Sequence, residues 1–226
     1  MGFFKIQGNS LLFRENGETV LITPWGRNAL RVRAVFLGDV PATSAALLPA
    51  DPIEPEIEIG EYTASIRNGG ICAELNVAEW GHYLQTVFKN AEGKVLLSEL
   101  SSGGALARKA RHFKPLPGGG YKLIASFQPE EEKLYGMGQY QQEILDLKGC
   151  NLELAHRNSQ ASVPFYLSSR GYGFLWNNAA VGEVHFGLNS TQWVAEETKL
   201  LDYWIVAGDS PAEIEQAYAE ATGDCI

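Results

Sequence analysis

GICAELNVAEWGHYLQTVFKNAEGKVLLSEL, residues 70–100, consists of three short segments in which apolar and polar residues partly alternate. The segments 70–77, 81–90 and 93–100 are rich in β-branched and aromatic residues, and turn-forming residues such as the Asn-Ala-Glu-Gly at 90–93 separate them. Period-two alternation over a few residues is typical of β-strands with one buried face. This stretch therefore predicts consecutive antiparallel strands.

The same pattern extends beyond this stretch. Residues 30–38 and 55–66 also carry β-branched or aromatic residues at alternating positions. Further turn signals lie at residues 16–18, 67–70 and 116–121. The 24 glycines are spread at short intervals, which is typical of many short strands joined by tight turns. We therefore expect an all-β fold, a large antiparallel β-sandwich.

Two acidic runs are expected to face water. In IEPEIEIGEY, residues 53–62, isoleucines alternate with Glu54, Glu56 and Glu58, so one face of a strand would be apolar and the other acidic. The run from Glu130 to Glu132 follows a proline in an expected loop. Both runs predict solvated carboxylates rather than a catalytic pair.

One helix is predicted in GDSPAEIEQAYAEATG, residues 208–223. Ser210 is a candidate N-cap, Pro211 suits the first helical position, and Glu213 can complete a capping box. Gly223 is placed to end the helix. Its apolar face would consist of Ile214, Ala217, Tyr218 and Ala221. We expect a sandwich over residues 1–208 and a capped linker helix over residues 209–226.

The overall composition argues against several classes of protein. The chain has 226 residues, of which 45% are hydrophobic, and a formal net charge of −9. This size suits one large domain with its own core. The 18 lysines and arginines form no basic stripe, which argues against a nucleic-acid or membrane partner. No apolar run is long enough for a membrane span and the first ten residues do not resemble a signal peptide, so a cytoplasmic protein is expected.

The sequence has no residue spacing typical of a metal or cofactor site. Cys72, Cys150 and Cys225 are an odd number at no metal-ligand spacing, which argues against a zinc site or a disulfide scaffold, and we expect free thiols. The four histidines lie singly. The glycines of YGMGQY and GYGFLW do not open a helix after a strand, so they do not indicate a phosphate site. We expect no cofactor and no metal.

The most informative block is residues 135–178. It begins with YGMGQ at 135–139, continues with VPFY at 163–166 and ends with RGYGFL at 170–175. In the order and spacing of these motifs, the chain resembles glycoside hydrolase family 31, which includes α-glucosidases and α-xylosidases. PWGRNALRVR at 24–33 and WIVAGDSPAEI at 204–214 extend the resemblance over most of the chain.

The resemblance implies an N-terminal β-sandwich of the galactose-mutarotase-like supersandwich type, followed in the family by a (β/α)8 catalytic barrel. A barrel requires about 250 residues, and this sequence ends where it would begin. The family's nucleophile motif, of the form W-x-D-M-N-E, is also missing, since the methionines are Met1 and Met137. We expect a parent enzyme that hydrolyses terminal α-glucosides or α-xylosides with retention, and a chain that is inactive without its downstream barrel.

The resemblance also implies a role for the polar loop before VPFY. In the family this loop reaches over the barrel and shapes the sugar pocket, and Arg157 and Asn158 align with its Arg-Asp pair. Planar amide and guanidinium groups suit the hydroxyls of an α-linked oligosaccharide. Alternatively, Arg157 pairs with Glu153 or Asp146 while the amides satisfy turn backbone groups. The candidate substrate-binding residues are Arg157, Asn158, Gln160, Gln139 and Gln141.

The aromatic residues after this loop are expected in the core. Phe165, Tyr166, Phe174 and Trp176 would alternate along two strands of a hairpin. Two other functions stay open at this point. A stand-alone carbohydrate-binding module would bind glycans on a face of the sandwich. An aldose epimerase would need a histidine and a carboxylate converging on a sugar, and no spacing singles out such a pair.

Overall fold

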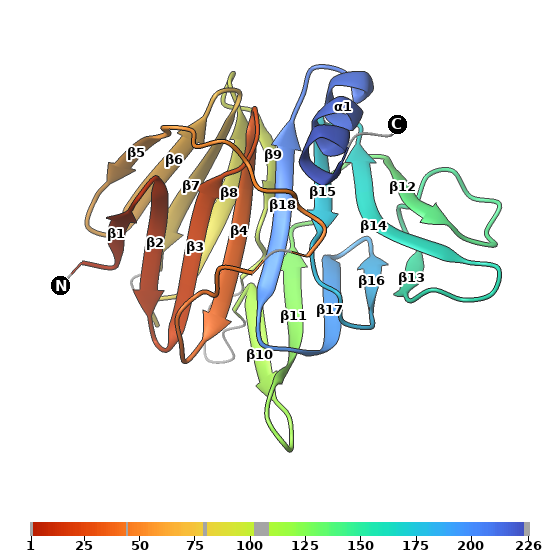
Figure 1. Cartoon of the computed structure of the whole chain (residues 1–226), viewed down its shortest axis with the longest axis horizontal. Coiled ribbons are helices and arrows are strands. Elements are labelled where there is room, and N and C mark those ends of the chain that lie inside the picture. Colours follow the sequence, from red (N-terminus) through yellow and green to blue (C-terminus); the bar gives the residue numbers. More distant parts are fainter. Residues whose placement is uncertain (1, 44, 79–80, 102–108, 224–226) are drawn as a thin grey trace.

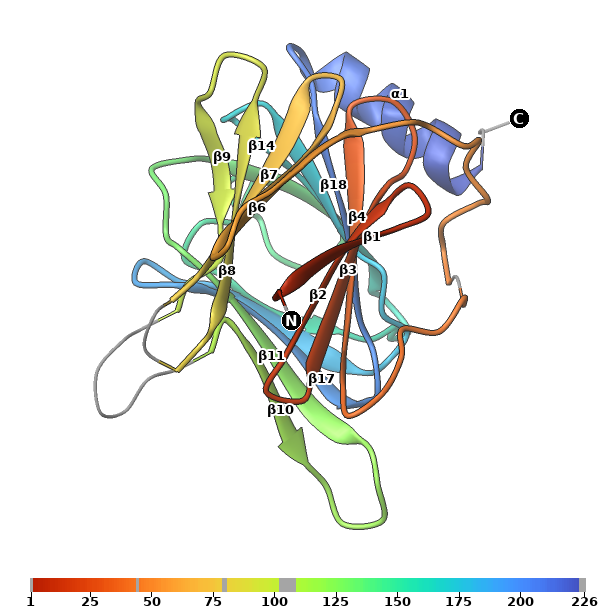
Figure 2. The same ribbon diagram turned by 90° about the vertical axis from the view of Figure 1, so that its left-hand side faces the viewer.

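The computed structural model describes residues 2–43, 45–78, 81–101 and 109–223. The strands are antiparallel and form one 8-stranded sheet and two 5-stranded sheets, with a single helix among the described residues (Figure 1). The all-β prediction is confirmed. The two 5-stranded sheets together face the 8-stranded sheet, so that the molecule has two main layers (Figure 2).

The 8-stranded sheet contains both the first and the last strand of the chain. In order across the sheet, its strands are β1 (Phe4–Gln7), β2 (Ser10–Glu15), β3 (Glu18–Pro24), β4 (Ala29–Phe36), β18 (Leu201–Ala207), β15 (Tyr172–Trp176), β14 (Ala161–Ser168) and β12 (Leu134–Gln139). Every residue of β3, β15 and β18 is buried, because both faces of the sheet centre are covered. A strand buried on both faces needs no polar side, which explains the weak alternation in these segments.

The two 5-stranded sheets form the second layer. The first consists of β5 (Glu56–Ile59), β6 (Thr63–Asn68), β7 (Ile71–Val77), β8 (Leu84–Asn90) and β9 (Val95–Ser98). The second consists, in spatial order, of β10 (Arg111–Pro115), β11 (Tyr121–Phe127), β17 (Thr191–Thr198), β16 (Gly182–Phe186) and β13 (Asn151–Leu154). A β-bridge between Glu99 and Phe127 joins these two sheets, so the layer is nearly continuous.

An aromatic cluster fills the space between the layers. Trp193 is fully buried and stacks on Phe174 and Trp176, with ring centroids 5.3 and 5.5 Å apart. Tyr166 and Phe174 are likewise stacked at 5.5 Å. The predicted core positions of Tyr166, Phe174 and Trp176 are therefore confirmed. Phe165 is buried too, but on the outer face of the 8-stranded sheet.

A buried ion network ties all three sheets together. Arg111 donates from Nε to Glu18 at 2.7 Å and also pairs with Glu99. Tyr203 donates to the same Glu99 carboxylate at 3.2 Å. Burial by itself would lower the pKa of Arg111, but the two glutamates raise that pKa above its ordinary value. The guanidinium therefore stays charged inside the sandwich.

Helix α1 (Pro211–Thr222) covers the outer face of the 8-stranded sheet. Ser210 caps it by accepting a hydrogen bond from the Glu213 backbone N–H at 3.3 Å, and the sequence-predicted helix is confirmed. The Glu213 carboxylate differs slightly from a capping box, since it accepts from Asp209 N at 2.9 Å. Ile214 is buried, and the Tyr218 ring stacks on Phe165 at 3.9 Å. The helix thus packs on its own sandwich.

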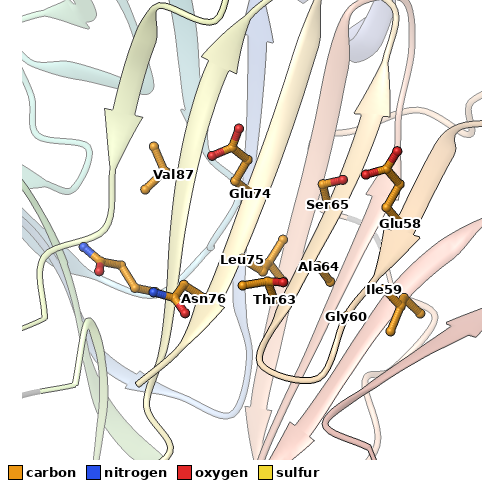
Figure 3. Close-up of a pocket in the computed structure, with 11 residues that line it drawn as sticks. Glu58, Ile59, Gly60, Thr63, Ala64, Ser65, Glu74, Leu75, Asn76 and Val87 are labelled. Carbon is orange, nitrogen blue, oxygen red and sulfur yellow. The ribbon is translucent and has the colours of Figure 1, made fainter. Parts of the chain in front are cut away.

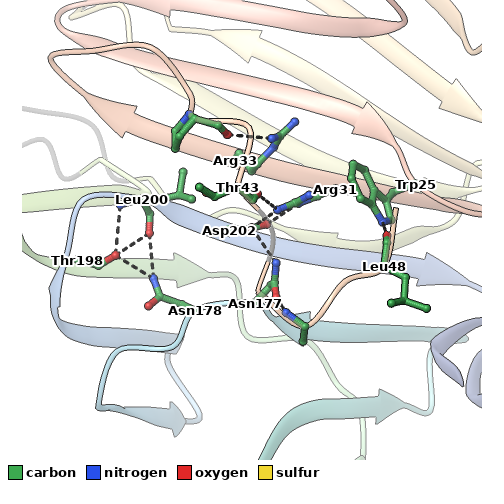
Figure 4. Close-up of polar contacts among 12 residues, drawn as sticks. Trp25, Arg31, Arg33, Thr43, Leu48, Asn177, Asn178, Thr198, Leu200 and Asp202 are labelled. Atoms are coloured by element: carbon green, nitrogen blue, oxygen red, sulfur yellow. Dashed lines mark hydrogen bonds and ion pairs between the residues drawn. The ribbon is translucent and has the colours of Figure 1, made fainter. Parts of the chain in front are cut away.

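Residues 41–43 and 45–48, which we call the strap, lie on the same outer face beside the helix (Figure 4). Arg31 donates to both oxygens of Asp202, at 3.0 and 2.6 Å, and to the Thr43 carbonyl at 2.8 Å. Leu47 is only 3% exposed, and Leu48 N donates to the Ala221 carbonyl of the helix at 2.8 Å. Backbone and side chain together fix the strap to the sheet.

Two predictions from the sequence are wrong. The expected single strand 55–66 is a hairpin of β5 and β6, because the chain turns at Gly60, whose N–H donates to Thr63 O at 2.7 Å. Glu132 is not solvated, since its side chain is only 3% exposed. It accepts hydrogen bonds from Tyr172 at 2.9 Å and from Ser168, and Lys148 Nζ lies 3.6 Å away. These partners come from distant segments, which the local run of glutamates does not reveal.

Candidate functional site

The predicted sugar-binding residues gather in a lobe at one end of the molecule, at the right of Figure 1. We call this lobe the tip. It consists of the loops 140–150 and 155–160 together with the ends of β12, β13 and β14 from which they extend. The strands of the N-terminal half, β1 to β8, lie at the opposite end of the view. The tip is therefore well separated from that half of the molecule.

The YGMG motif positions the tip through its backbone. Gly136, Met137 and Gly138 all have positive φ angles, of 119°, 70° and 88°, where the pairing of β12 with β14 shifts register. A Cβ at Gly138 would lie 2.3 Å from the Ala161 carbonyl, so no larger residue fits without movement. The Met137 side chain is fully buried between the layers. The motif is a β-bulge anchored in the core.

Arg157 is held by an ion pair within the tip. Its Nε donates to Glu153 at 2.9 Å, and a second guanidinium nitrogen pairs with the other carboxylate oxygen. This hydrogen bonding lowers the pKa of Glu153 and raises that of Arg157. Backbone bonds between Arg157 and Gln160, at 3.0 and 3.2 Å, close the loop. Of the two acidic partners proposed from the sequence, Arg157 selects Glu153.

The glutamines stand in different environments. Gln141 donates to Ser159 Oγ at 2.7 Å and links the two tip loops. Gln160 donates to the Ala155 carbonyl at 3.0 Å, so its amide stabilises the turn. Gln139 is exposed at the end of β12, opposite Ala161 in the register. Only Gln139 of the three therefore keeps an amide without a hydrogen bond within the described residues.

Tyr140 braces the tip from beneath, although the sequence reasoning did not single it out. Its hydroxyl donates to the Glu153 carbonyl at 2.9 Å and lies 2.9 Å from Ser162 Oγ. Burial raises the pKa of Tyr140, so the hydroxyl remains a donor. Its place next to the YGMGQ motif was the only signal available. Ser159, which receives Gln141, was missed as well.

Asn158 lies at the exposed turn of the loop, between Arg157 and Ser159 in the sequence. No hydrogen bond from its amide is found in the described part of the chain. Exposed apolar side chains flank the same lobe, since Leu145 is 80%, Ile144 53% and Val163 39% exposed. The tip thus presents an exposed amide, on a loop closed by backbone bonds between Arg157 and Gln160, beside exposed apolar side chains.

Two carboxylates of the tip make structural contacts. Glu153 is paired with Arg157, and Asp146 accepts from the backbone N–H groups of Leu134 and Lys148, at 3.0 and 3.1 Å. These backbone hydrogen bonds lower the pKa of Asp146, and the bond from Leu134 has the largest effect. Both carboxylates are therefore committed to structure.

Among the described residues, no group of three or more His, Cys, Asp or Glu side chains could hold a metal ion. Cys72 and Cys150 are free, and Cys225 lies outside the described residues. No helix in the described part of the chain combines the length and apolar character that crossing a membrane requires.

Comparison with known proteins defines the class of this fold. The family profile described as "Glycosyl hydrolase 31 N-terminal galactose mutarotase-like domain" matches residues 19–184. The sandwich is therefore of the galactose-mutarotase-like class. A family 31 α-xylosidase from a soil metagenome, solved with xylose, superposes with a TM-score of 0.91 and 44% identity. That match covers 97% of this chain and 34% of the α-xylosidase.

Two curated relatives agree with this match. An uncharacterized family 31 glucosidase from Pseudescherichia vulneris is 46% identical over 95% of this chain and 43% of its own length. α-Xylosidase A from Aspergillus niger is 28% identical over 91% of the chain and 30% of its own length. The chain belongs to glycoside hydrolase family 31. It spans less than half of either relative and matches their N-terminal, non-catalytic domain.

Proposed function

We propose that this chain is the supporting N-terminal domain of a retaining α-glycosidase that acts on terminal α-xylosides or α-glucosides. In this proposal the sandwich packs against a downstream catalytic barrel, and the tip completes the sugar pocket of that barrel. The substrate class follows from the relatives, which are named as α-xylosidases and a glucosidase. The absence of a basic stripe favours neutral substrates in a cytoplasmic enzyme.

The observation that carries the proposal is the state of Asn158. The neighbouring residues at the tip are bound to one another, and Arg157, Gln141 and Gln160 each have an internal partner. The amide of Asn158 is exposed and has no hydrogen bond among the described residues, whereas Arg157 and Ser159 on either side of it do. Such an amide offers both a donor and an acceptor, which suits a pyranose hydroxyl.

The exposed apolar residues of the tip support the second half of the proposal. Leu145 and Ile144 stand on the loop next to the one that carries Asn158. Apolar side chains with such exposure are typical of surfaces that a partner covers. A barrel seated on this loop would bury them and bring its own carboxylates to the sugar held by the tip.

Steady-state kinetics of the full-length enzyme would test the role of the tip. With p-nitrophenyl α-xyloside and α-glucoside as substrates, Asn158→Ala should lower kcat/KM by about 10-fold, as expected for one lost polar contact. Gln7→Ala is the matched control, because it removes an equally exposed amide at the far end of the molecule. Unchanged kinetics of the Asn158 variant would remove the tip from the sugar pocket.

A further inference from the structure

An open groove lies on the outer face of β5 to β8, far from the tip (Figure 3). Its volume is about 720 Å³, within the range of small-ligand sites. The strands present their outward side chains to it while Ala64 and Leu75 point toward the core and form its floor. The lining residues are Glu58, Ile59, Gly60, Thr63, Ala64, Ser65, Glu74, Leu75, Asn76, Gln85 and Val87.

Strand register aligns the polar lining in rows. Thr63 is the partner of Asn76, and Asn76 is the partner of Gln85 on the next strand. Neighbouring strands lie about 4.8 Å apart, so a row of such groups spans a distance comparable with consecutive sugar rings. A second row runs parallel to it through Ser65 and Glu74. The groove therefore offers hydroxyl, amide and carboxylate groups at regular intervals.

Several of these polar side chains have no hydrogen-bond or ion-pair partner among the described residues. Among the described residues, the side chains of Thr63, Ser65 and Asn76 have no hydrogen bond, and that of Glu58 has no ion pair. Glu74, in contrast, pairs with Lys89 at 2.6 Å, and Gln85 donates to the Glu99 carbonyl at 2.9 Å. The groove thus combines fixed groups at one side with free donors and acceptors in its centre.

We propose that this groove is a second binding site for a neutral oligosaccharide, distinct from the sugar pocket assigned to the tip. Hydroxyl and amide groups in rows match the hydroxyls of consecutive pyranose rings. Val87, the register partner of Glu74 on the outward face, supplies apolar contact for the C–H face of a ring. Glu58 and Glu74 favour an uncharged ligand, because a sugar acid would meet their negative charge. The choice of an α-linked ligand rests on the proposed function.

Nuclear magnetic resonance of the 226-residue chain, titrated with maltotriose, would test this site. Maltotriose should shift the backbone amide signals of Thr63, Ser65 and Asn76 with a Kd of about 1 mM, as expected for a shallow polar site. Asn76→Ala should weaken binding about five-fold or more. Trigalacturonate, which is anionic, should bind much more weakly than maltotriose.

Control variants separate the groove from the tip. Thr63→Val preserves side-chain shape and removes one hydroxyl, so it provides a second test should the Asn76 variant fold poorly. Asn158→Ala should leave groove binding unchanged. The second site would be overturned if maltotriose did not shift the groove signals. It would also be overturned if both the Asn76 and the Thr63 variant bound maltotriose with the affinity of the unaltered chain. Either result would leave the kinetic test of the tip unaffected.

Discussion

The strap (residues 41–43 and 45–48) and the tip loop (residues 140–150) both lie outside the strands, yet the molecule holds them in opposite ways. The strap buries Leu47 and gives its carbonyl groups to arginines of the sheet. The tip loop exposes Leu145 and Ile144 to solvent. The first loop completes the sandwich, whereas the second leaves apolar side chains exposed.

The arginine ion pairs of the two regions differ in the same way. The pair of Arg31 with Asp202 is buried, at 1% and 3% side-chain exposure. That of Arg157 with Glu153 is exposed, at 63% and 43%. Similar geometry therefore has different energetic consequences, because an exposed pair is screened by water and a buried pair is not. Only the buried pair is expected to decide whether the chain folds.

Removing a partner from the buried pair should have the largest effect. Asp202→Ala leaves Arg31 and the neighbouring Arg33 buried without a carboxylate, so the free energy of unfolding should fall by about 3–5 kcal/mol. Urea denaturation measures this change. Glu153→Ala is the control and should leave the denaturation midpoint nearly unchanged. Comparable losses in both variants would contradict the distinction between the two regions.

A pair of leucine variants tests the loops themselves. Leu47→Ala should destabilise the chain by about 3 kcal/mol, since a buried leucine leaves a cavity under the strap. Leu145→Ala should change the free energy of unfolding by less than about 0.5 kcal/mol, because the side chain is 80% exposed. Thermal unfolding provides the measurement. A large loss in the Leu145 variant would mean that the tip loop is structural.

The bulge of β12 is expected to be more sensitive than other turns of positive φ. Gly138→Ala should cost about 2 kcal/mol or more, because its Cβ would collide with the Ala161 carbonyl. Gly149 has a φ of 90°, but no atom lies within 4 Å of a Cβ added there. Gly149→Ala should therefore lower the free energy of unfolding by only about 1 kcal/mol. Equal losses in denaturation experiments would show that φ alone sets the cost.

The smallest effect is a titration shift at the tip. The folded pKa of Glu153 lies below its unfolded value because Arg157 stabilises the carboxylate. The pair therefore contributes to stability at pH values above the unfolded pKa, and this contribution is lost as the pH falls through the folded pKa. Carbon-13 resonances of the Glu153 carboxyl group should report a lowered pKa that returns to normal in Arg157→Ala. An unaltered pKa would argue against the pair in solution.

Local signals predicted much of the fold. The Asn-Gly turn at 16–17 has positive φ angles of 51° and 79° at its two residues, and the capped helix begins at Pro211. The hairpin at Gly60 was missed because alternation continues on both sides of the turn. The Arg111 network was also out of reach, since Arg111 and Glu18 are 93 residues apart.

One contact of the tip was foreseen as an alternative, the pairing of Arg157 with Glu153, and the groove was not foreseen. The resemblance to family 31 placed Arg157 and Asn158 together, and their spacing from Glu153 allowed the ion pair. The role of Tyr140 depends on a hydroxyl that reaches β13 and β14 at once. The groove depends on the register between β6, β7 and β8. Such contacts follow from three-dimensional pairing rather than from any one segment.

The bulge at Gly136 to Gly138 has one more consequence, for behaviour in concentrated solution. β12 is an outermost strand of the 8-stranded sheet, and β1 at the other edge is only 4 residues long. A long regular edge would let a second chain add its own strand and start an aggregate. The irregular backbone of β12 interrupts that template, so the motif that shapes the tip also protects the sheet from growing.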